Sequence, residues 1–129
     1  MAYERDIPTL GICCGQTVMA RALGSTSIIV DASKHERADD LYAHSISVYP
    51  ETKFGKIVHT KEMQVNSRHH HSILTYQNLE VSAIDMDGNI EVLEAPEKKF
   101  YIGIRFHPES LYKIDPVMDR IFQEFIKAC

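Results

Sequence analysis

The chain has 129 residues, of which 44% are hydrophobic and 25% charged, a balance typical of one soluble globular domain. Its 14 Lys and Arg residues against 18 Asp and Glu residues give a net charge of −4, and the longest basic block is Lys98-Lys99, which argues against a nucleic-acid-binding surface. No charged-then-apolar leader and no apolar run of membrane-spanning length occurs, so neither export nor membrane insertion is indicated and a cytoplasmic location is expected.

The first part of the chain predicts a strand, a sharp turn and a helix. Met1 to Ile7 has the pattern of a helix tail, and Pro8 ends it before the short apolar stretch Thr9 to Ile12, which fits a buried strand. The next helix is predicted over Gln16 to Leu23, and Gly24 stands where a left-handed C-terminal cap belongs.

The middle of the chain predicts loops and short strands. Ser27 to Val30 and His44 to Tyr49 have the composition of strands, and the polar segment Asp31 to Asp40 separates them. We expect this region to form loop and edge sheet.

The remainder predicts a hairpin, one more strand and a helix. Val81 to Asp85 and Ile90 to Leu93 flank an Asp-Gly pair, which is a strong hairpin signal, and Phe100 to Phe106 supplies a further strand. Asp115-Pro116 places a capping side chain before a proline at the first position of a C-terminal helix. The apolar stripe of this helix consists of Val117, Ile121, Phe122, Phe125 and Ile126.

Three cysteines form an odd and badly spaced set for disulfides, which indicates reduced thiols. The order Gly11-x-Cys13-x-Gly15 between a strand and a helix is typical of a nucleophile turn, in which the glycines remove side chains that would collide with a strained backbone. The start of the helix would lower the pKa of Cys13, and Cys14 would offer its backbone N–H as an oxyanion donor. The alternative is that both cysteines are small buried hydrophobic residues.

The segment His107-Pro108-Glu109 offers a base and an orienting group. If the backbone stays extended here, residues two apart point to the same side, so the imidazole and the carboxylate can lie together. A thiol needs a nearby base to become a nucleophile, and that base needs a third group to fix its tautomer. Cys13, His107 and Glu109 would supply these three groups; the alternative is a His-Pro turn with a solvated glutamate.

Four ordered motifs resemble class I glutamine amidotransferase-like proteins, most of all the γ-glutamyl-γ-aminobutyrate hydrolase type of γ-glutamyl peptidase. The motifs are GICCG (Gly11 to Gly15), VNSRHHH (Val65 to His71), DGNIEVLE (Asp87 to Glu94) and GIRFHPE (Gly103 to Glu109). The resemblance implies that residues 1–129 form one domain, equivalent to the C-terminal two thirds of such a fold. The implied α/β fold is a truncated flavodoxin-like, mostly parallel sheet with flanking helices and a β-hairpin.

The resemblance implies attack of Cys13 on a γ-glutamyl amide carbonyl, release of the amine and hydrolysis of a thioester. His107 would act as general base and then acid, Glu109 would hold the imidazole, and no cofactor would be needed. The oxyanion and substrate-binding candidates are Cys14, Gly15, Asn66, Ser67, His69 and His70. Adjacent histidines point in different directions and lack a metal-ligand spacing, so we expect no metal site.

The sequence departs from the family pattern near the predicted site. Cys14 stands where the family often has an arginine or an aliphatic residue, and Thr17 stands where it often has a glutamine. Arg105 and His71 each stand at a further position where a glutamine is common. Substrate contacts are therefore expected to differ.

Family members have strand and helix units ahead of the nucleophile strand that this sequence lacks, including a loop that donates an oxyanion N–H. Their absence would expose a sheet edge, which proteins normally pair or cover. We therefore expect a homo-oligomer or a second chain to supply the missing layer. The alternative function is a non-catalytic binding or assembly module derived from the same fold.

Overall fold

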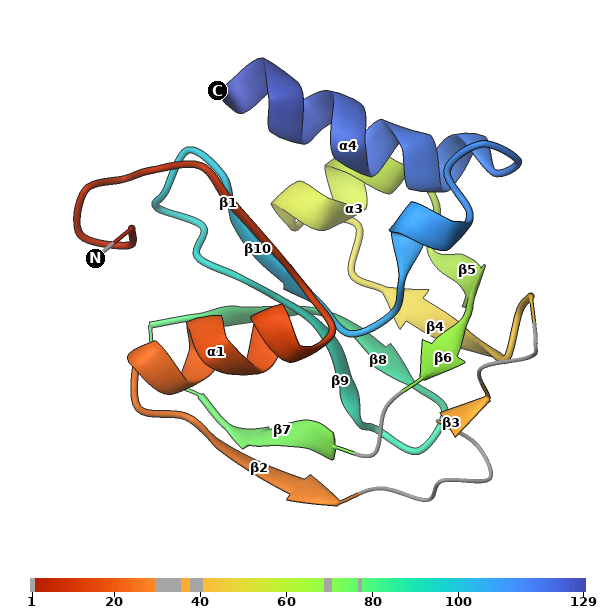
Figure 1. Cartoon of the computed structure of the whole chain (residues 1–129), viewed down its shortest axis with the longest axis horizontal. Coiled ribbons are helices and arrows are strands. Elements are labelled where there is room, and N and C mark those ends of the chain that lie inside the picture. The colour runs from red at the N-terminus through yellow and green to blue at the C-terminus, as the bar shows by residue number, and fades with distance from the viewer. Residues whose placement is uncertain (1, 30–35, 38–40, 69–70, 77) are drawn as a thin grey trace.

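The computed structural model describes residues 2–29, 36–37, 41–68, 71–76 and 78–129 (Figure 1). The predicted loop over Asp31 to Asp40 falls largely outside these residues. In chain order the elements are β1 (Thr9–Ile12), α1 (Cys14–Ala22), β2 (Thr26–Ile29), β3 (Glu36–Arg37), β4 (His44–Val48), α3 (Lys53–Val58), β5 (Glu62–Val65), β6 (Ser67–Arg68), β7 (His71–Thr75), β8 (Glu80–Asp85), β9 (Ile90–Glu94), β10 (Tyr101–Ile104), the 3₁₀ turn η1 (Pro108–Ser110) and α4 (Pro116–Ala128).

A six-stranded sheet in the order β1-β10-β9-β8-β4-β5 forms the centre of the molecule. Only β1 and β10 run parallel, and the other four pairings are antiparallel. The expectation of a mostly parallel sheet is therefore wrong for the described strands. Residues 86–89 join β8 to β9 and residues 95–100 join β9 to β10, and links this short cannot make the crossover that parallel neighbours need.

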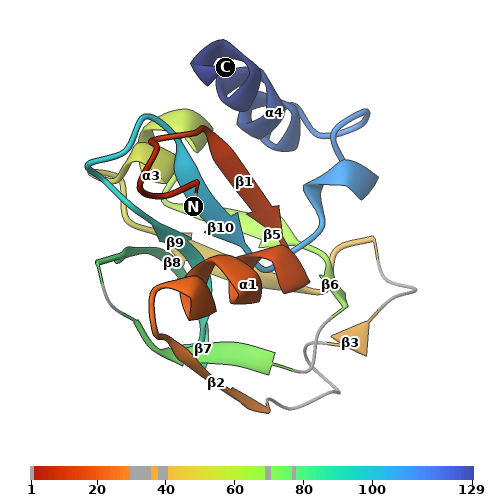
Figure 2. The same cartoon turned by 60° about the vertical axis from the view of Figure 1, so that its left-hand side comes forward.

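Helices cover both faces of this sheet, as predicted for an α/β fold (Figures 1 and 2). On one face α1 packs on β1 and β10, with the two-stranded β2–β7 sheet beside it. On the other face α3 and α4 pack together over the larger hydrophobic core, which contains Phe54, Ile102, Ile104, Met118 and Ile121. None of the helices in the described part of the chain has the length and apolarity to span a bilayer.

The hairpin and the two capped helices follow their sequence signals. Asp85 Oδ1 accepts hydrogen bonds from the backbone N–H groups of Asp87 and Asn89, which closes the β8–β9 turn. Gly24 has φ 91°, the left-handed conformation predicted for it, and its N–H donates to Arg21. Asp115 caps α4 by accepting from Val117 N at 3.0 Å.

Two local predictions fail for tertiary reasons. The segment before β1 forms turns instead of a helix tail, because Asp6 adopts φ 53° and its carboxylate accepts the N–H of Lys99. The short helix α3 was not predicted, because part of its N-terminal capping comes from elsewhere in the chain. Glu94, about forty residues away on β9, accepts the N–H groups of Lys53 and Phe54.

Two glycines bring α1 directly onto the β1–β10 pair. Gly11 and Gly103 are register partners in this parallel pair. A Cβ at Gly11 would lie 2.8 Å from the Gly15 backbone, and a Cβ at Gly103 would lie 2.9 Å from the Gln16 side chain. Because neither strand has a side chain here, the first turn of α1 sits against the sheet, at the point where the chain leaves β1.

Candidate active site

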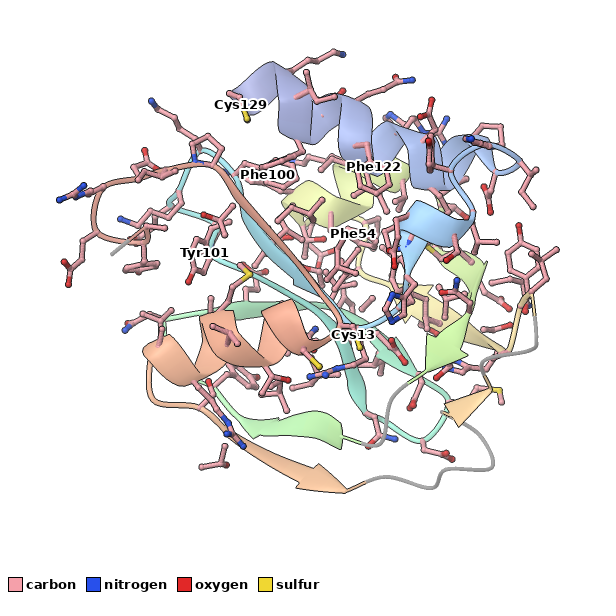
Figure 3. The ribbon with its side chains drawn as sticks, in the orientation of Figure 1. Cys13, Phe54, Phe100, Tyr101, Phe122 and Cys129 are labelled. Atoms are coloured by element: carbon pink, nitrogen blue, oxygen red, sulfur yellow. The ribbon has the colours of Figure 1, made fainter. Side chains whose placement is uncertain are left out.

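Cys13 lies at the turn between β1 and α1 (Figure 3). Its backbone adopts φ 55° and ψ −109°, a conformation that costs a non-glycine residue free energy and that clusters at functional sites. The Cys13 N–H donates to the carbonyl of Ile104 at 2.8 Å, which ties the turn to the end of β10. A strained strand-to-helix turn is therefore present where the sequence predicts one, and Cys13 stands at its apex.

His107 follows β10 and hydrogen-bonds Glu109 through Nδ1 and Oε1. The predicted pairing is present, but its backbone differs from the extended one expected, since Pro108 opens the 3₁₀ turn η1. The turn brings the two side chains together instead. The side chain of His107 is 20% exposed and that of Glu109 44%, so the imidazole is partly shielded while its carboxylate partner faces solvent.

The parallel pairing of β1 and β10 brings both motifs to one end of the sheet. Ile12 and Ile104 are register partners, and both strands end there. Cys13 follows the first strand by one residue and His107 follows the second by three. Carboxyl ends of adjacent parallel strands are the usual location of ligand sites in α/β folds.

Asn66 fixes the backbone of His107. Its Nδ2 donates to the His107 carbonyl at 2.9 Å, and its Oδ1 accepts the His107 N–H at 2.8 Å. Asn66 is only 2% exposed and Ser67 is fully buried, so in this structure neither offers a side chain to a ligand in solution. The sequence associated Asn66 with substrate binding, whereas its observed contacts orient the predicted base. His69 and His70 lie outside the described residues.

Cys14 and Gly15 begin α1, next to Cys13. The Cys14 side chain is exposed, and as the first residue of a helix it has a backbone N–H without an intrahelical partner. A Cβ at Gly15 would meet nothing within 4 Å. Of the two glycines predicted to avoid collisions, only Gly11 is thus sterically required.

The three cysteines are free thiols, and Cys129 lies at the far end of α4 from the β1–α1 turn (Figure 3). Within the described residues, no three His, Cys, Asp or Glu side chains converge as a metal site would require.

Arg105 is buried and directly follows Ile104, whose carbonyl holds the Cys13 N–H. Its Nη2 donates to Thr17 Oγ1 at 2.7 Å, so two residues that depart from the family pattern contact each other. Burial raises the pKa of the Cys13 thiol, Cys14 raises it further, and the positive charge of Arg105 lowers it. The net effect is a raised pKa of Cys13. This corrects the expectation that the helix N-terminus lowers the pKa of this thiol.

Glu91 is a buried carboxyl near this arginine that the sequence motif did not single out. It lies on β9, is 1% exposed, and its Oε1 is 3.4 Å from His44 Nε2. Burial, followed by repulsion from Asp85, raises the pKa of Glu91 from 4.5 to about 8, against the opposing effect of Arg105. The sequence signal that could have indicated this buried carboxyl is a glutamate within the otherwise apolar run Ile90 to Leu93.

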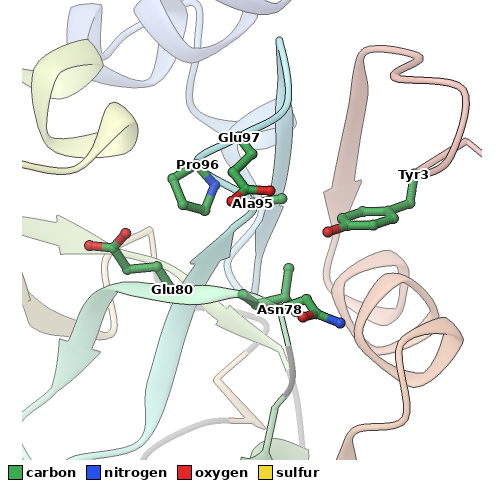
Figure 4. Close-up of a pocket in the computed structure, with 7 residues that line it drawn as sticks. Tyr3, Asn78, Glu80, Ala95, Pro96 and Glu97 are labelled. Atoms are coloured by element: carbon green, nitrogen blue, oxygen red, sulfur yellow. The ribbon is translucent and has the colours of Figure 1, made fainter.

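A pocket of about 280 Å³ opens at the other end of the β1–β10 pair (Figure 4). Its lining residues are Tyr3, Asn78, Leu79, Glu80, Ala95, Pro96 and Glu97. These residues precede β1 or lie next to the start of β8 and the end of β9, and they include none of the predicted catalytic residues. The pocket is therefore separate from the Cys13 turn.

The chain is similar to known proteins over most of its length. Residues 1–109 match the model of the family Peptidase C26. A candidate glutamine amidotransferase of Mycobacterium tuberculosis is 32% identical, over 98% of this chain and 42% of the relative. The glutamine-hydrolyzing GMP synthase of Chlamydia caviae is 30% identical, over 97% of this chain and 23% of the relative.

Among solved structures, a candidate GMP synthase subunit from Thermoplasma acidophilum superimposes with a TM-score of 0.74 at 22% identity, over 98% of this chain and 59% of that one. This likeness shows that the chain shares the α/β fold of that structure. The chain spans about half the length of the curated relatives it matches, with 42% and 62% of the first two covered. On the family match, the chain belongs to the Peptidase C26 family of class I glutamine amidotransferase-like proteins.

Proposed function

We propose that this chain is a cysteine hydrolase that cleaves a γ-glutamyl amide, either glutamine or a γ-glutamyl-amine, through a thioester intermediate. The observation that carries the proposal is the placement of Cys13, on a strained turn at a helix N-terminus, at the end of the strand pair that also leads to the His107–Glu109 pair. The family membership and the glutamine amidotransferase relatives support the same reaction class.

In the proposed reaction His107 first removes the proton from Cys13 Sγ. The thiolate then attacks the amide carbon, and the Cys14 N–H stabilises the oxygen that becomes negatively charged. His107 gives the proton to the departing nitrogen, so the C–N bond breaks and an amine or ammonia leaves. Water, deprotonated by His107, hydrolyses the thioester to a γ-carboxylate and restores the thiol. Glu109 holds the imidazole throughout, and Asn66 fixes its backbone.

The raised pKa of Cys13 agrees with a mechanism in which Cys13 is the nucleophile and His107 takes its proton. A thiol that stays protonated in the free protein needs proton transfer to His107 at the moment of attack, as in an acid–base pair. The protein would then be protected from unspecific alkylation while no substrate is bound. A reducing, cytoplasmic setting is part of this proposal, because the nucleophile must remain a free thiol.

Product analysis separates the two substrate classes. The protein is incubated with glutamine and, separately, with γ-glutamyl-aminobutyrate, and released glutamate is measured by chromatography. Preference for the second substrate would support the γ-glutamyl peptidase branch, and preference for glutamine an amidotransferase-type glutaminase. Failure to release glutamate from either, with a folded protein, would overturn the hydrolase proposal in favour of the non-catalytic module.

We also propose that the open edge of β1 is covered by a second copy of the chain. Among the described strands β1 pairs only with β10 and ends the sheet, and Ile7, just ahead of it, is 48% exposed. Exposed edges of this kind promote strand pairing between chains. Light scattering of the purified 129-residue chain is expected to give the mass of a dimer. A monomeric mass at working concentration would contradict this assembly.

A further inference from the structure

The largest fully buried side chain in the described structure is a charged one, that of Arg105. Arg105 follows the last residue of β10, its side chain contacts Thr17 of α1, and it is 2% exposed. Burying a guanidinium is costly unless anionic groups and hydrogen bonds compensate for its lost hydration. The groups around Arg105 should therefore indicate which negative charge the guanidinium stabilises.

Three acidic groups interact with this guanidinium. Burial lowers the pKa of Arg105, while Cys13, Glu91 and Cys14, in that order, raise it again. The carbonyl of Ile104, the residue before Arg105, accepts the Cys13 N–H at 2.8 Å, so the arginine directly follows the strand end that holds the Cys13 turn. Its own backbone N–H donates to the carbonyl of Glu91 at 2.8 Å, so β9 and the end of β10 are fixed relative to each other.

The hydrogen bond to Thr17 orients the guanidinium. Thr17 lies in the first turns of α1, and its Oγ1 accepts from Nη2. The arginine is thereby held between the helix that begins after Cys13 and the strand that carries Glu91. An arginine in this setting stays charged, because the guanidinium is the most basic side-chain group in proteins and does not give up its proton there.

We propose that Arg105 is the cation that stabilises the Cys13 thiolate in this site, and that Glu91 competes with the thiolate for the same positive charge. The role rests on the proposed function, in which Cys13 must become a thiolate before it attacks the substrate. His107 remains the group that takes the proton, and Arg105 makes the resulting negative charge less costly. Arg105 would thus lower the barrier to proton transfer without itself exchanging a proton.

The groups that act on the Cys13 thiol do so in opposite directions. Cys14 opposes ionisation of Cys13, and Arg105 favours it. Glu91 is itself faced by Asp85 on β8 and by His44 on β4. Removing the charge at Arg105 should disfavour the thiolate, and removing the carboxylate at Glu91 should favour it.

The pH dependence of Cys13 alkylation by iodoacetamide tests this proposal without relying on enzyme activity. The thiolate displaces iodide, so the rate follows the ionised fraction. Labelling of the peptide that contains Cys13 is followed by mass spectrometry between pH 6.5 and 10.5. Arg105→Gln is expected to move the profile to higher pH by about one unit, which makes labelling about tenfold slower on its rising part. Arg105→Lys, which keeps the charge, should recover part of the rate.

Glu91→Gln is the matched variant, because above about pH 8, where the Glu91 carboxyl ionises, it removes a charge of opposite sign from the same cluster. It is expected to move the profile in the opposite direction, to lower pH, and by less. General damage to the fold would move both variants the same way. An Arg105→Gln profile that overlays the wild type, or shifts of the same sign in both variants, would overturn the proposal. If the protein hydrolyses γ-glutamyl amides but the variants show no such shifts, only the role of Arg105 is overturned. If the shifts occur but no hydrolysis is found, only the proposed function is overturned.

Discussion

Raising the pH from 5 to 8 is expected to destabilise the wild-type protein, and Glu91→Gln is expected to remove much of that loss. The pKa of Glu91 rises from 4.5 when the chain is unfolded to about 8 in the fold, because the carboxyl is buried. Between these values the folded state holds the proton more tightly than the unfolded state, so folding stability falls as the pH rises. One pKa unit is worth about 1.4 kcal/mol, which places the maximal loss at roughly 5 kcal/mol.

Urea unfolding at pH 5, 6.5 and 8 measures this effect. The glutamine variant keeps the size of the side chain and resembles the protonated acid, so the two proteins should be similar at pH 5 and diverge as the pH rises. The difference between the two curves matters more than either curve, because histidines and other carboxylates titrate in both proteins. Curves that remain parallel from pH 5 to 8 would show that Glu91 ionises in the fold as easily as in water.

Cys13→Ala is expected to lower the rate of γ-glutamyl amide hydrolysis by about 10³-fold or more, because it removes the nucleophile of the proposed reaction. Cys14→Ala is the matched control, since it deletes a thiol one residue away and keeps the backbone N–H. We expect it to retain activity within about tenfold of the wild type. Rates are compared by glutamate release at one protein concentration.

The reverse ranking would overturn the assignment of Cys13 to the apex of the turn. Comparable loss in both variants would indicate that the alanine at position 14 disturbs the turn, and circular dichroism of both proteins would detect such damage. Equal, unimpaired activity in both variants would mean that neither thiol takes part in the reaction.

Much of the site's framework could be predicted from the sequence because its signals are local. The Gly11-x-Cys13-x-Gly15 pattern between an apolar stretch and a helix led to the strained turn that the backbone adopts. The pairing of His107 with Glu109 was also predicted, although through an extended backbone where a 3₁₀ turn is found. Proline at position 108 is compatible with either conformation, so the residues alone could not decide between them.

The remaining features depend on contacts between distant parts of the chain. Helix α3 is capped in part by Glu94 of β9, and Asn66 holds the backbone of a histidine 41 positions later. Arg105 appeared in the sequence only as a departure from the family pattern. Its contact with Thr17, 88 positions earlier, becomes visible only when α1 lies on the Gly11–Gly103 pair.

The strand directions were mispredicted for a similar reason. The resemblance implied a mostly parallel sheet, while the short links around β9 permit only antiparallel neighbours there. The Asp-Gly pair did indicate one of these hairpins. The single parallel pair, β1 with β10, is nevertheless the one that brings the two predicted catalytic motifs to the same end of the sheet.

Covalent trapping tests the central claim most directly. A diazoketone analogue of glutamine is incubated with the protein, and the modified residue is identified by peptide mass spectrometry. The claim predicts loss of dinitrogen from the reagent, one adduct per chain located on Cys13, protection by excess glutamine or γ-glutamyl-aminobutyrate, and no adduct in Cys13→Ala. Modification that falls equally on Cys14 and Cys129, or that neither substrate slows, would contradict it.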